Sequence, residues 1–379
     1  MIGGSVDEIT DVQLIIQFAL SIIMIMPALY WFKMREEIFE GSPEKNSEKN
    51  DLKIHIILPM RNEITNVERK ISSIISEILP YKSVFLTVAD SSSSDGTISV
   101  AESLLRSSDL EDYRWGIENF EMRGKNIALN GVIEKNEADI FVMSDADANV
   151  SPGWLRIILS RLSEKDIGVV SGIEAENSYG SDFNSYYRRK SNWLRIMESR
   201  LDSTPILEGS ILAWKAESVG SFRFDERVNA DDAQIGLHSI KCGHRSIVDP
   251  RIIFEDFGSE KRTFRESIRR AQGLSIALMS NLDLAIMKGR GFARSAIFNA
   301  VVLYIFFPWS ALFFVINALI AFLNDPIIGH SWEFYSITSV LIVSMMPQGR
   351  SLIIGSTISI IAHLQAIIGR RYSKWEPYR

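Results

Sequence analysis

The sequence contains a single cysteine, Cys242, and has no excess of basic residues. One cysteine cannot form an internal disulfide, and zinc sites built on several cysteines are also excluded. The net charge of −6 argues against nucleic acid as the main partner, because nucleic-acid-binding surfaces are basic. The five histidines show no spacing typical of metal ligands, so we assign them no role.

The 379 residues allow one large domain or two ordinary ones. The mean hydropathy of +0.06 is high for a chain with 23% charged residues, because long apolar runs lie near both ends. Residues 12–32 carry no charge and are about long enough to cross a bilayer once. Acidic residues precede this run and Lys33 and Arg35 follow it, which favours an anchor with the chain continuing in the cytoplasm over a cleaved signal peptide. A buried core helix is the alternative.

The second apolar region starts near residue 296, and basic residues before it place its entry in the cytoplasm. Residues 296–323 and 351–369 are long enough to span, whereas 334–346 are too short and are expected to be re-entrant, interfacial or part of a broken helix. The basic tail predicts a cytoplasmic end and therefore two crossings. The expected division is an anchor (1–33), a linker (34–51), an α/β domain (52–280) and a membrane region (281–379).

Between the two membrane regions, short apolar runs alternate with segments of helical periodicity. This alternation predicts an α/β fold with a mainly parallel sheet. Ligands in such sheets bind just past the carboxyl ends of the strands, and four expected strands each lead into a polar cluster. The strands are residues 54–59, 84–89, 113–120 and 140–144, and the clusters are 61–63, 90–97, 123–125 and 145–147. Their acids, one lysine and small residues predict a site for a nucleotide with a metal ion.

Asp145 and Asp147 follow the fourth strand two residues apart, so both side chains are expected on one face. Two carboxylates in this position suit Mg²⁺ or Mn²⁺, which prefer oxygen ligands and also bind phosphates. A solvated turn or a helix cap is the alternative.

Taken in order, these clusters resemble the motifs of family 2 glycosyltransferases of the GT-A fold. Gly209-Ser210, Asp231-Asp232 and Arg269-Arg270 continue the match, which covers about residues 52–280. The resemblance implies an enzyme that transfers a sugar from a nucleotide-sugar donor with inversion.

The resemblance also implies roles for individual residues. Asp147 would bind the metal, Asp145 would lie near the ribose, and Asp232 would be the general base, with Asp231 replacing the usual Glu. Ser91 replaces the common second acid after Asp90, which leaves the nucleotide preference open. The remaining donor-binding residues are expected to be Pro59, Asn62, Glu63, Asp90 and Lys125.

Arg269 lies where many processive family members have a Gln-x-x-Arg-Trp motif. Here Glu266 replaces the Gln and Arg270 replaces the Trp, which argues against processive polymerisation. Arg269 would bind the diphosphate, or its basic helix would rest on anionic lipid. Residues 182–202 read as an amphipathic segment at the membrane surface or beside the acceptor.

The sequence thus predicts a multi-pass protein of the cell membrane with a cytoplasmic catalytic domain. Its donor would be a UDP- or GDP-sugar, its cofactor Mn²⁺ or Mg²⁺, and its acceptor a lipid or lipid-linked glycan, without nucleic acid. A polyprenyl-phosphate glycosyl synthase, a nucleotidyltransferase and a non-catalytic scaffold are the alternatives. A nucleotidyltransferase would normally carry a Gly-rich basic loop near the amino terminus, which the sequence lacks.

Overall fold

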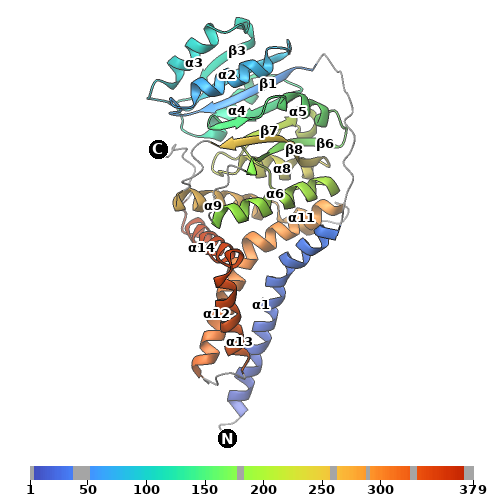
Figure 1. Cartoon of the computed structure of the whole chain (residues 1–379), viewed down its shortest axis with the longest axis vertical. Helices are drawn as coiled ribbons and strands as arrows, with labels where there is room; N and C mark the ends of the chain where they lie inside the picture. Colours follow the sequence, from blue (N-terminus) through green and yellow to red (C-terminus); the bar gives the residue numbers. More distant parts are fainter. Residues whose placement is uncertain are drawn as a thin grey trace.

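A computed structural model describes residues 4–36, 52–176, 183–256, 263–286, 291–324 and 331–370. Most of the expected linker and the basic tail after Arg370 lie outside these ranges. Figure 1 shows a sheet domain above a layer of crossing helices, with a helical stalk that extends away from the sheet.

The described residues form one eight-stranded sheet in the order β3-β2-β1-β4-β7-β6-β8-β5. Four neighbouring pairs are parallel and three are antiparallel, so the expected α/β fold is confirmed with a mixed sheet. The strands are β1 (Ile54–Met60), β2 (Val84–Asp90), β3 (Trp115–Asn119), β4 (Ile140–Ser144), β5 (Ala148–Val150), β6 (Ile167–Glu174), β7 (Ile211–Lys215) and β8 (Arg245–Asp256).

Helices cover both faces of the sheet, and strand β1 shows how the sequence divides them. Ile54, Ile56 and Leu58 pack into one apolar cluster, whereas Ile57 points into another on the opposite face. The first cluster includes residues of α2 (Val67–Ile78), α3 (Thr97–Arg106) and α5 (Trp154–Leu162). The second includes residues of α4 (Lys125–Lys135), α7 (Ala216–Val219) and α8 (Asp231–Lys241). Burial on both faces explains why these strands are continuous apolar runs.

One expected boundary differs from the structure. The strand expected at residues 113–120 is shorter, because a 3-10 turn, Asp112–Arg114, precedes β3. Helix α8 begins at Asp231, so the acidic pair lies in its first turn. Two carboxylates in a first helical turn interact favourably with the helix dipole, so the acids belong to the helix itself.

A layer of helices lies between the sheet and the stalk (Figure 1). It contains α6 (Phe183–Leu201), α9 (Phe264–Ser280), α10 (Leu282–Ile286) and α11 (Gly291–Val301). A third apolar cluster joins α8 to α9, α10 and α11. The expected division at residue 280 stays a prediction.

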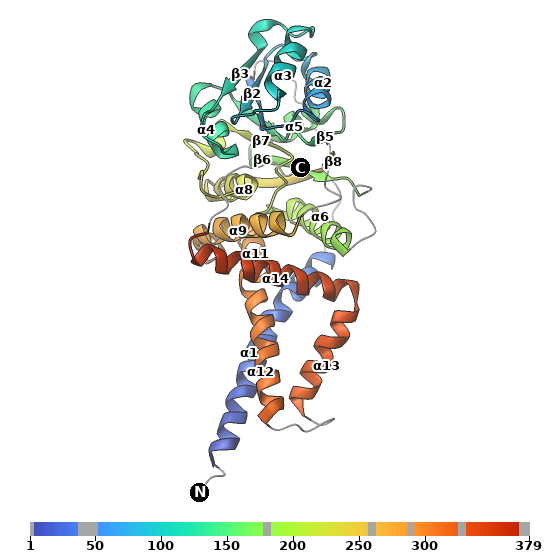
Figure 2. The ribbon, with the colours of Figure 1, turned by 90° about the vertical axis from the view of Figure 1, so that its left-hand side faces the viewer.

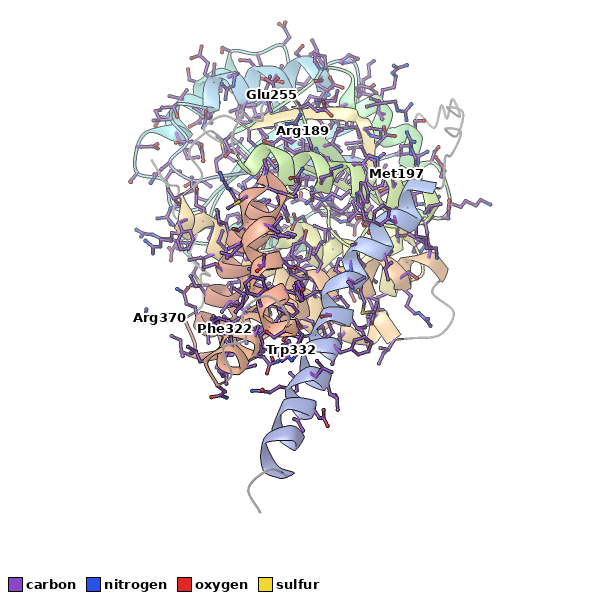
Figure 3. The ribbon with its side chains drawn as sticks, turned by 60° about the horizontal axis from the view of Figure 1, so that its bottom comes forward. Arg189, Met197, Glu255, Phe322, Trp332 and Arg370 are labelled. Carbon is purple, nitrogen blue, oxygen red and sulfur yellow. The ribbon has the colours of Figure 1, made fainter. Side chains whose placement is uncertain are left out.

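The stalk contains α1 (Gly4–Glu36), α12 (Phe307–Asn324) and α13 (Trp332–Met345), with a π-helical segment, Val302–Phe306, leading into α12. Among the described residues, three segments are long and apolar enough to cross a membrane: Asp11–Met34, Gly291–Asn324 and Pro347–Ile367. Figure 3 views the molecule from the stalk side and labels Phe322 of α12 and Trp332 of α13, which lie at the ends of these helices that are remote from the sheet. These helices support association with a membrane.

Helix α14 (Pro347–Ile367) does not run along the stalk as expected for a second crossing at residues 351–369. Figure 2 shows it lying across the stalk beneath the helix layer of α6 and α9, while α13 returns beside α12. Its turn from α13 is tight, because a Cβ at Gly349 would lie 1.8 Å from the Val343 carbonyl oxygen. Apolar side chains such as Leu352 and Leu364 are exposed. The structure therefore pairs α12 with α13, and α14 resembles an interfacial helix.

Candidate active site

Strands β1, β2 and β4 bring three of the expected clusters to one edge of the sheet. Asp90 ends β2 beside Met60 of β1, and Asp145 directly follows β4. The Asp90 carboxylate accepts the backbone N–H of Ser93 at 3.1 Å, and the Asp90 backbone oxygen accepts the N–H of Phe120 at 2.8 Å. Pro59 lies within β1 opposite Ala89. The side chain of Asp90 is therefore fixed at the strand end where a ligand is expected.

Asn62 and Glu63, the two donor-site residues expected in the loop after β1, make different contacts. Asn62 has a left-handed backbone (φ 52°), and its Oδ1 accepts the N–H of Ser94 at 2.8 Å. Its amide oxygen thus holds the neighbouring loop. Glu63 accepts a hydrogen bond from Asn66 at 2.8 Å. Burial raises the pKa of Glu63, and the negative charges of Asp145 and Asp95 raise it further.

Lys125 connects the two acidic motifs. Its Nζ lies 2.6 Å from an oxygen of Asp145 and 2.9 Å from an oxygen of Asp231, and only 12% of its side chain is exposed. Burial alone would lower the pKa of Lys125, but the two carboxylates raise it. The structure therefore joins the acids after β4 to the acids that begin α8 through one ammonium group. The ammonium group of Lys125 thus offsets part of the negative charge of Asp145 and Asp231.

Asp147 lies among other acids. Burial raises its pKa, and the charges of Asp145, Asp256 and Glu63 raise it further, whereas Arg270 lowers it. Asp256, at the end of β8, accepts a hydrogen bond from the Ser210 hydroxyl at 2.8 Å. No three His, Cys, Asp or Glu side chains of the described part converge in metal-binding geometry. Oxygen donors with uncompensated negative charge nevertheless fit a hard divalent cation whose other ligands come from a diphosphate.

Lys70 is a site residue that the sequence analysis missed. It lies on α2 with 3% of its surface exposed, and its Nζ donates to Ser144 Oγ and to the Ala148 carbonyl, both at 2.7 Å. Both acceptors flank the Asp145–Asp147 segment. Burial lowers the pKa of Lys70 to about 8, while the nearby acids oppose this shift. A lysine on the apolar face of an amphipathic helix was the available signal.

Asp232 occupies the first turn of α8 beside Asp231. Its Oδ1 accepts the N–H of Ala233 at 2.7 Å. Burial raises the pKa of Asp232, the charges of Asp231 and Glu208 raise it further, and Lys125 opposes them. A carboxyl with a raised pKa is a suitable proton acceptor for a hydroxyl group.

Helix α9 places Arg270 near the acids of the site. Arg270, which exposes part of its side chain, interacts electrostatically with Asp256, Glu208, Asp232 and Asp145. Glu266 and Thr263 form a reciprocal capping box at the start of the helix. The glutamate at the Gln position of the processive motif thus has a structural task. Arg270 lies among the site acids, and the diphosphate role expected for Arg269 stays a prediction.

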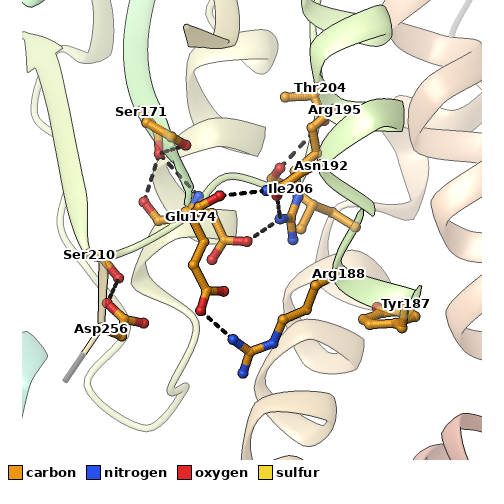
Figure 4. Close-up of polar contacts among 12 residues, drawn as sticks. Ser171, Glu174, Tyr187, Arg188, Asn192, Arg195, Thr204, Ile206, Ser210 and Asp256 are labelled. Carbon is orange, nitrogen blue, oxygen red and sulfur yellow. Dashed lines mark hydrogen bonds and ion pairs between the residues drawn. The ribbon is translucent and has the colours of Figure 1, made fainter. Parts of the chain in front are cut away.

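Two buried ion pairs connect α6 to the sheet, and Figure 4 shows the one between Arg188 and Glu174. Arg188 pairs with Glu174 at the end of β6, and Arg195 pairs with Glu208 before β7. Asn192 lies between them and donates to the Glu174 carbonyl at 3.1 Å. The expected amphipathic segment at 182–202 is thus a helix. A small cavity beside Arg195 is lined by α6, residues 204–206 and the helices after residue 299.

Residues 55–218 match glycosyl transferase family 2. Glycosyltransferase AglE of Haloferax volcanii is 27% identical over 119 residues, which are 31% of this chain and 38% of that protein. The match therefore spans well under half the length of this relative.

Among solved structures, the mannosyltransferase PcManGT from Pyrobaculum calidifontis, in complex with GDP-Man and Mn²⁺, superposes with a TM-score of 0.79 at 21% identity. The match covers 94% of this chain and 99% of that chain. A glucosyl-3-phosphoglycerate synthase from Mycobacterium tuberculosis, in complex with Mn²⁺ and UDP, matches with a TM-score of 0.46 at 18% identity, over 64% of this chain and 86% of that chain.

At these identities the structural matches concern the fold, and the family match concerns residues 55–218. Residues 55–218 therefore match a glycosyltransferase family 2 domain, the fold of the chain is GT-A-like, and apolar helices lie on both sides of the matched region.

Proposed function

We propose that this protein is a membrane-bound inverting glycosyltransferase that takes its sugar from a nucleotide-sugar donor. The observation that carries the proposal is the Lys125 bridge between Asp145 and Asp231. It brings a donor-side acid and the start of α8, where Asp232 lies, into a single site. The family match and the matching structure with bound GDP-Man support the same reading.

The donor would bind along the carboxyl ends of β1, β2 and β4. Asp90 is held where it can accept a hydrogen bond from the nucleotide base, and Pro59 and Glu63 lie on the adjacent strand and loop. The donor would be a GDP- or UDP-sugar, and the matching structure with bound GDP-Man and Mn²⁺ supports a nucleotide sugar.

Asp147, with Asp145, would hold Mn²⁺ or Mg²⁺. A bound cation neutralises the diphosphate as the sugar leaves it. The negative surroundings of Asp147 favour such a cation. Arg270 lies close enough to these acids to add a second positive charge beside the diphosphate.

Asp232 would act as the general base. An acceptor hydroxyl attacks the anomeric carbon from the face opposite the diphosphate, and its proton passes to the Asp232 carboxylate. A new carbon–oxygen bond forms while the bond from the anomeric carbon to the diphosphate oxygen breaks. Its electron pair leaves with the nucleoside diphosphate, and the anomeric configuration inverts.

The acceptor would be a lipid or a lipid-linked glycan at the cytoplasmic face of the membrane. Helices α6, α9 and α14 separate the catalytic sheet from the stalk, so the site lies just beyond the membrane-proximal layer (Figure 2). A soluble acceptor would not require this arrangement.

The variant Asp232→Asn tests the base. We expect donor binding to persist and transfer to fall about 10²- to 10⁴-fold, the usual contribution of general base catalysis. Glu217→Gln, an exposed acid in the first turn of α7, is the control and should leave transfer unchanged. Near-full transfer by Asp232→Asn would contradict the assignment, and release of pyrophosphate instead of nucleoside diphosphate would identify a nucleotidyltransferase.

A further inference from the structure

Glu208 lies near Asp231 and Asp232, the acids of the proposed function, and none of the roles above uses it. Its backbone is fixed by Ser171 of β6, whose hydroxyl donates to the Glu208 carbonyl at 2.7 Å and accepts the Glu208 N–H at 3.1 Å. The next residue, Gly209, touches the site directly. A Cβ there would lie 3.5 Å from Asp231 Oδ2 and 3.9 Å from Asp232 Cβ. These backbone hydrogen bonds therefore fix the position of Glu208 beside Asp232.

The carboxylate of Glu208 is paired with Arg195 on α6. Only 13% of the Arg195 side chain and 19% of the Glu208 side chain are exposed. Arg195 also interacts electrostatically with Asp232, and its Nη1 donates to Asn192 Oδ1 at 3.3 Å. Its Nε is buried and has no hydrogen-bond partner within the described ranges. The pair therefore retains hydrogen-bonding capacity beside the base.

A buried ion pair is weak evidence for stability, because desolvation offsets most of the attraction between the charges. Well-packed apolar side chains at these two positions would attach α6 to the sheet equally well. The position of the pair, between Asp232 and the cavity under the membrane layer, suggests a task in recognition instead.

The charges around Asp232 distinguish the two acceptor chemistries. The acids are Asp231, Asp232 and Glu208. Of the positive groups near them, Lys125 and Arg195 are engaged in ion pairs, and Arg270 is the arginine that the proposed function places beside the donor diphosphate. A polyprenyl phosphate would bring another anion into this group of carboxylates and would be repelled. A sugar instead offers adjacent hydroxyls that donate to a carboxylate and accept from a guanidinium.

We propose that the Arg195–Glu208 pair is an acceptor subsite that selects a carbohydrate hydroxyl, carried on a lipid-linked glycan, over a phosphate acceptor. This inference rests on the proposed function. Glu208 binds the acceptor sugar next to the attacking hydroxyl, and Arg195 holds the carboxylate in position. Specificity arises because a site built to hydrogen-bond hydroxyls leaves its own polar groups unpaired with any other ligand.

The test uses the full chain in detergent, Mn²⁺ and the nucleotide sugar that it binds. The acceptor probes are a panel of octyl glycosides and, separately, farnesyl phosphate. We expect transfer to at least one glycoside and at least 100-fold less to farnesyl phosphate. Preferred transfer to farnesyl phosphate would overturn the inference, and so would donor binding without transfer to any glycoside.

The variants separate recognition from other roles. Glu208→Gln should raise the acceptor KM at least tenfold, with a smaller change in kcat and a donor Kd within twofold of wild type. Arg195→Lys keeps the charge and should raise the same KM less. The matched control is Arg188→Lys, in the neighbouring pair with Glu174 on the same helix, which should leave the acceptor KM unchanged.

Two results would contradict the subsite. An unchanged acceptor KM with a shifted pH–rate profile would show that Glu208 only adjusts the base, and equal losses in all three folded variants would show a structural role. Absence of donor binding by folded wild type is a different failure, because it would overturn the proposed function itself.

Discussion

The substitution Glu198→Gln should change the pH dependence of stability in a calculable way. Glu198 lies on α6 with 4% of its surface exposed. Its Oε1 accepts the Tyr30 hydroxyl of α1 at 3.0 Å, and its Oε2 accepts the Thr204 hydroxyl at 2.7 Å. This carboxyl therefore fixes the N-terminal apolar helix to the catalytic layer. Burial raises its pKa to about 7, although both hydrogen bonds oppose the shift.

The sign follows from proton linkage. The folded state holds the Glu198 proton more tightly than the unfolded state, whose pKa is near 4.5. Wild type should therefore lose stability as pH rises from 4.5 to 7, by about 3 kcal/mol in total at roughly 1.4 kcal/mol per pKa unit. Glutamine does not titrate, and it loses about one hydrogen bond, worth roughly 1 kcal/mol. Between pH 5 and pH 8, the stability difference should shift by about 2–3 kcal/mol in favour of the variant.

Thermal unfolding of both proteins in the same detergent, at pH 5, 6, 7 and 8, measures this shift. The stability of the variant relative to wild type should increase at each step up to pH 7 and stay constant above pH 7. The same substitution at exposed Glu217 serves as the control. A difference between variant and wild type that does not change with pH would refute the buried, protonated state of Glu198.

Further variants test the site and the helical layer. Lys70→Met should lower stability by up to about 3 kcal/mol, because it leaves two buried acceptors, Ser144 Oγ and the Ala148 carbonyl, without the donor that Lys70 Nζ supplies; a more stable variant would contradict this. Gly273→Ala places a Cβ 2.2 Å from the Asn229 carbonyl oxygen, so it should displace α9 and lower both the melting temperature and transfer. Gly355→Ala, whose Cβ meets nothing within 4 Å, should be neutral or slightly stabilising, and equal losses in both variants would refute the packing argument.

Local sequence patterns were sufficient to predict the strands that come early in the chain. Strands β1, β2 and β4 are apolar runs, and each begins at the residue that the sequence predicts and ends within one residue of the predicted end. The same patterns do not reveal antiparallel partners such as β7, which pairs with β4 about seventy residues earlier in the chain. Register of this kind is set by tertiary packing rather than by local sequence.

The site shows the same division. Motifs in order led to Asp145, Asp147, Lys125 and Asp232, and the structure brings the first and third together directly. Lys70 was missed, because its place on the apolar face of a helix does not reveal its acceptors, which lie 74 and 78 residues further along the chain.

The orientation of α14 was equally hidden. Apolar composition predicts a membrane helix, but contacts decide its direction. His363 of α14 hydrogen-bonds Ser275 of α9 at 2.9 Å and accepts the Trp309 indole N–H at 3.0 Å. These contacts hold α14 against the catalytic layer, which composition alone does not show.

The central claim is tested most directly by nucleotide-sugar binding to the purified full chain, with and without Mn²⁺, for wild type and Asp147→Ala. GDP- and UDP-sugars are compared in parallel, and folding is verified by thermal unfolding. The account predicts that one nucleotide binds in a metal-dependent manner and that the variant loses this binding while remaining folded. Absence of binding by folded wild type, or full metal-dependent binding by Asp147→Ala, would contradict it.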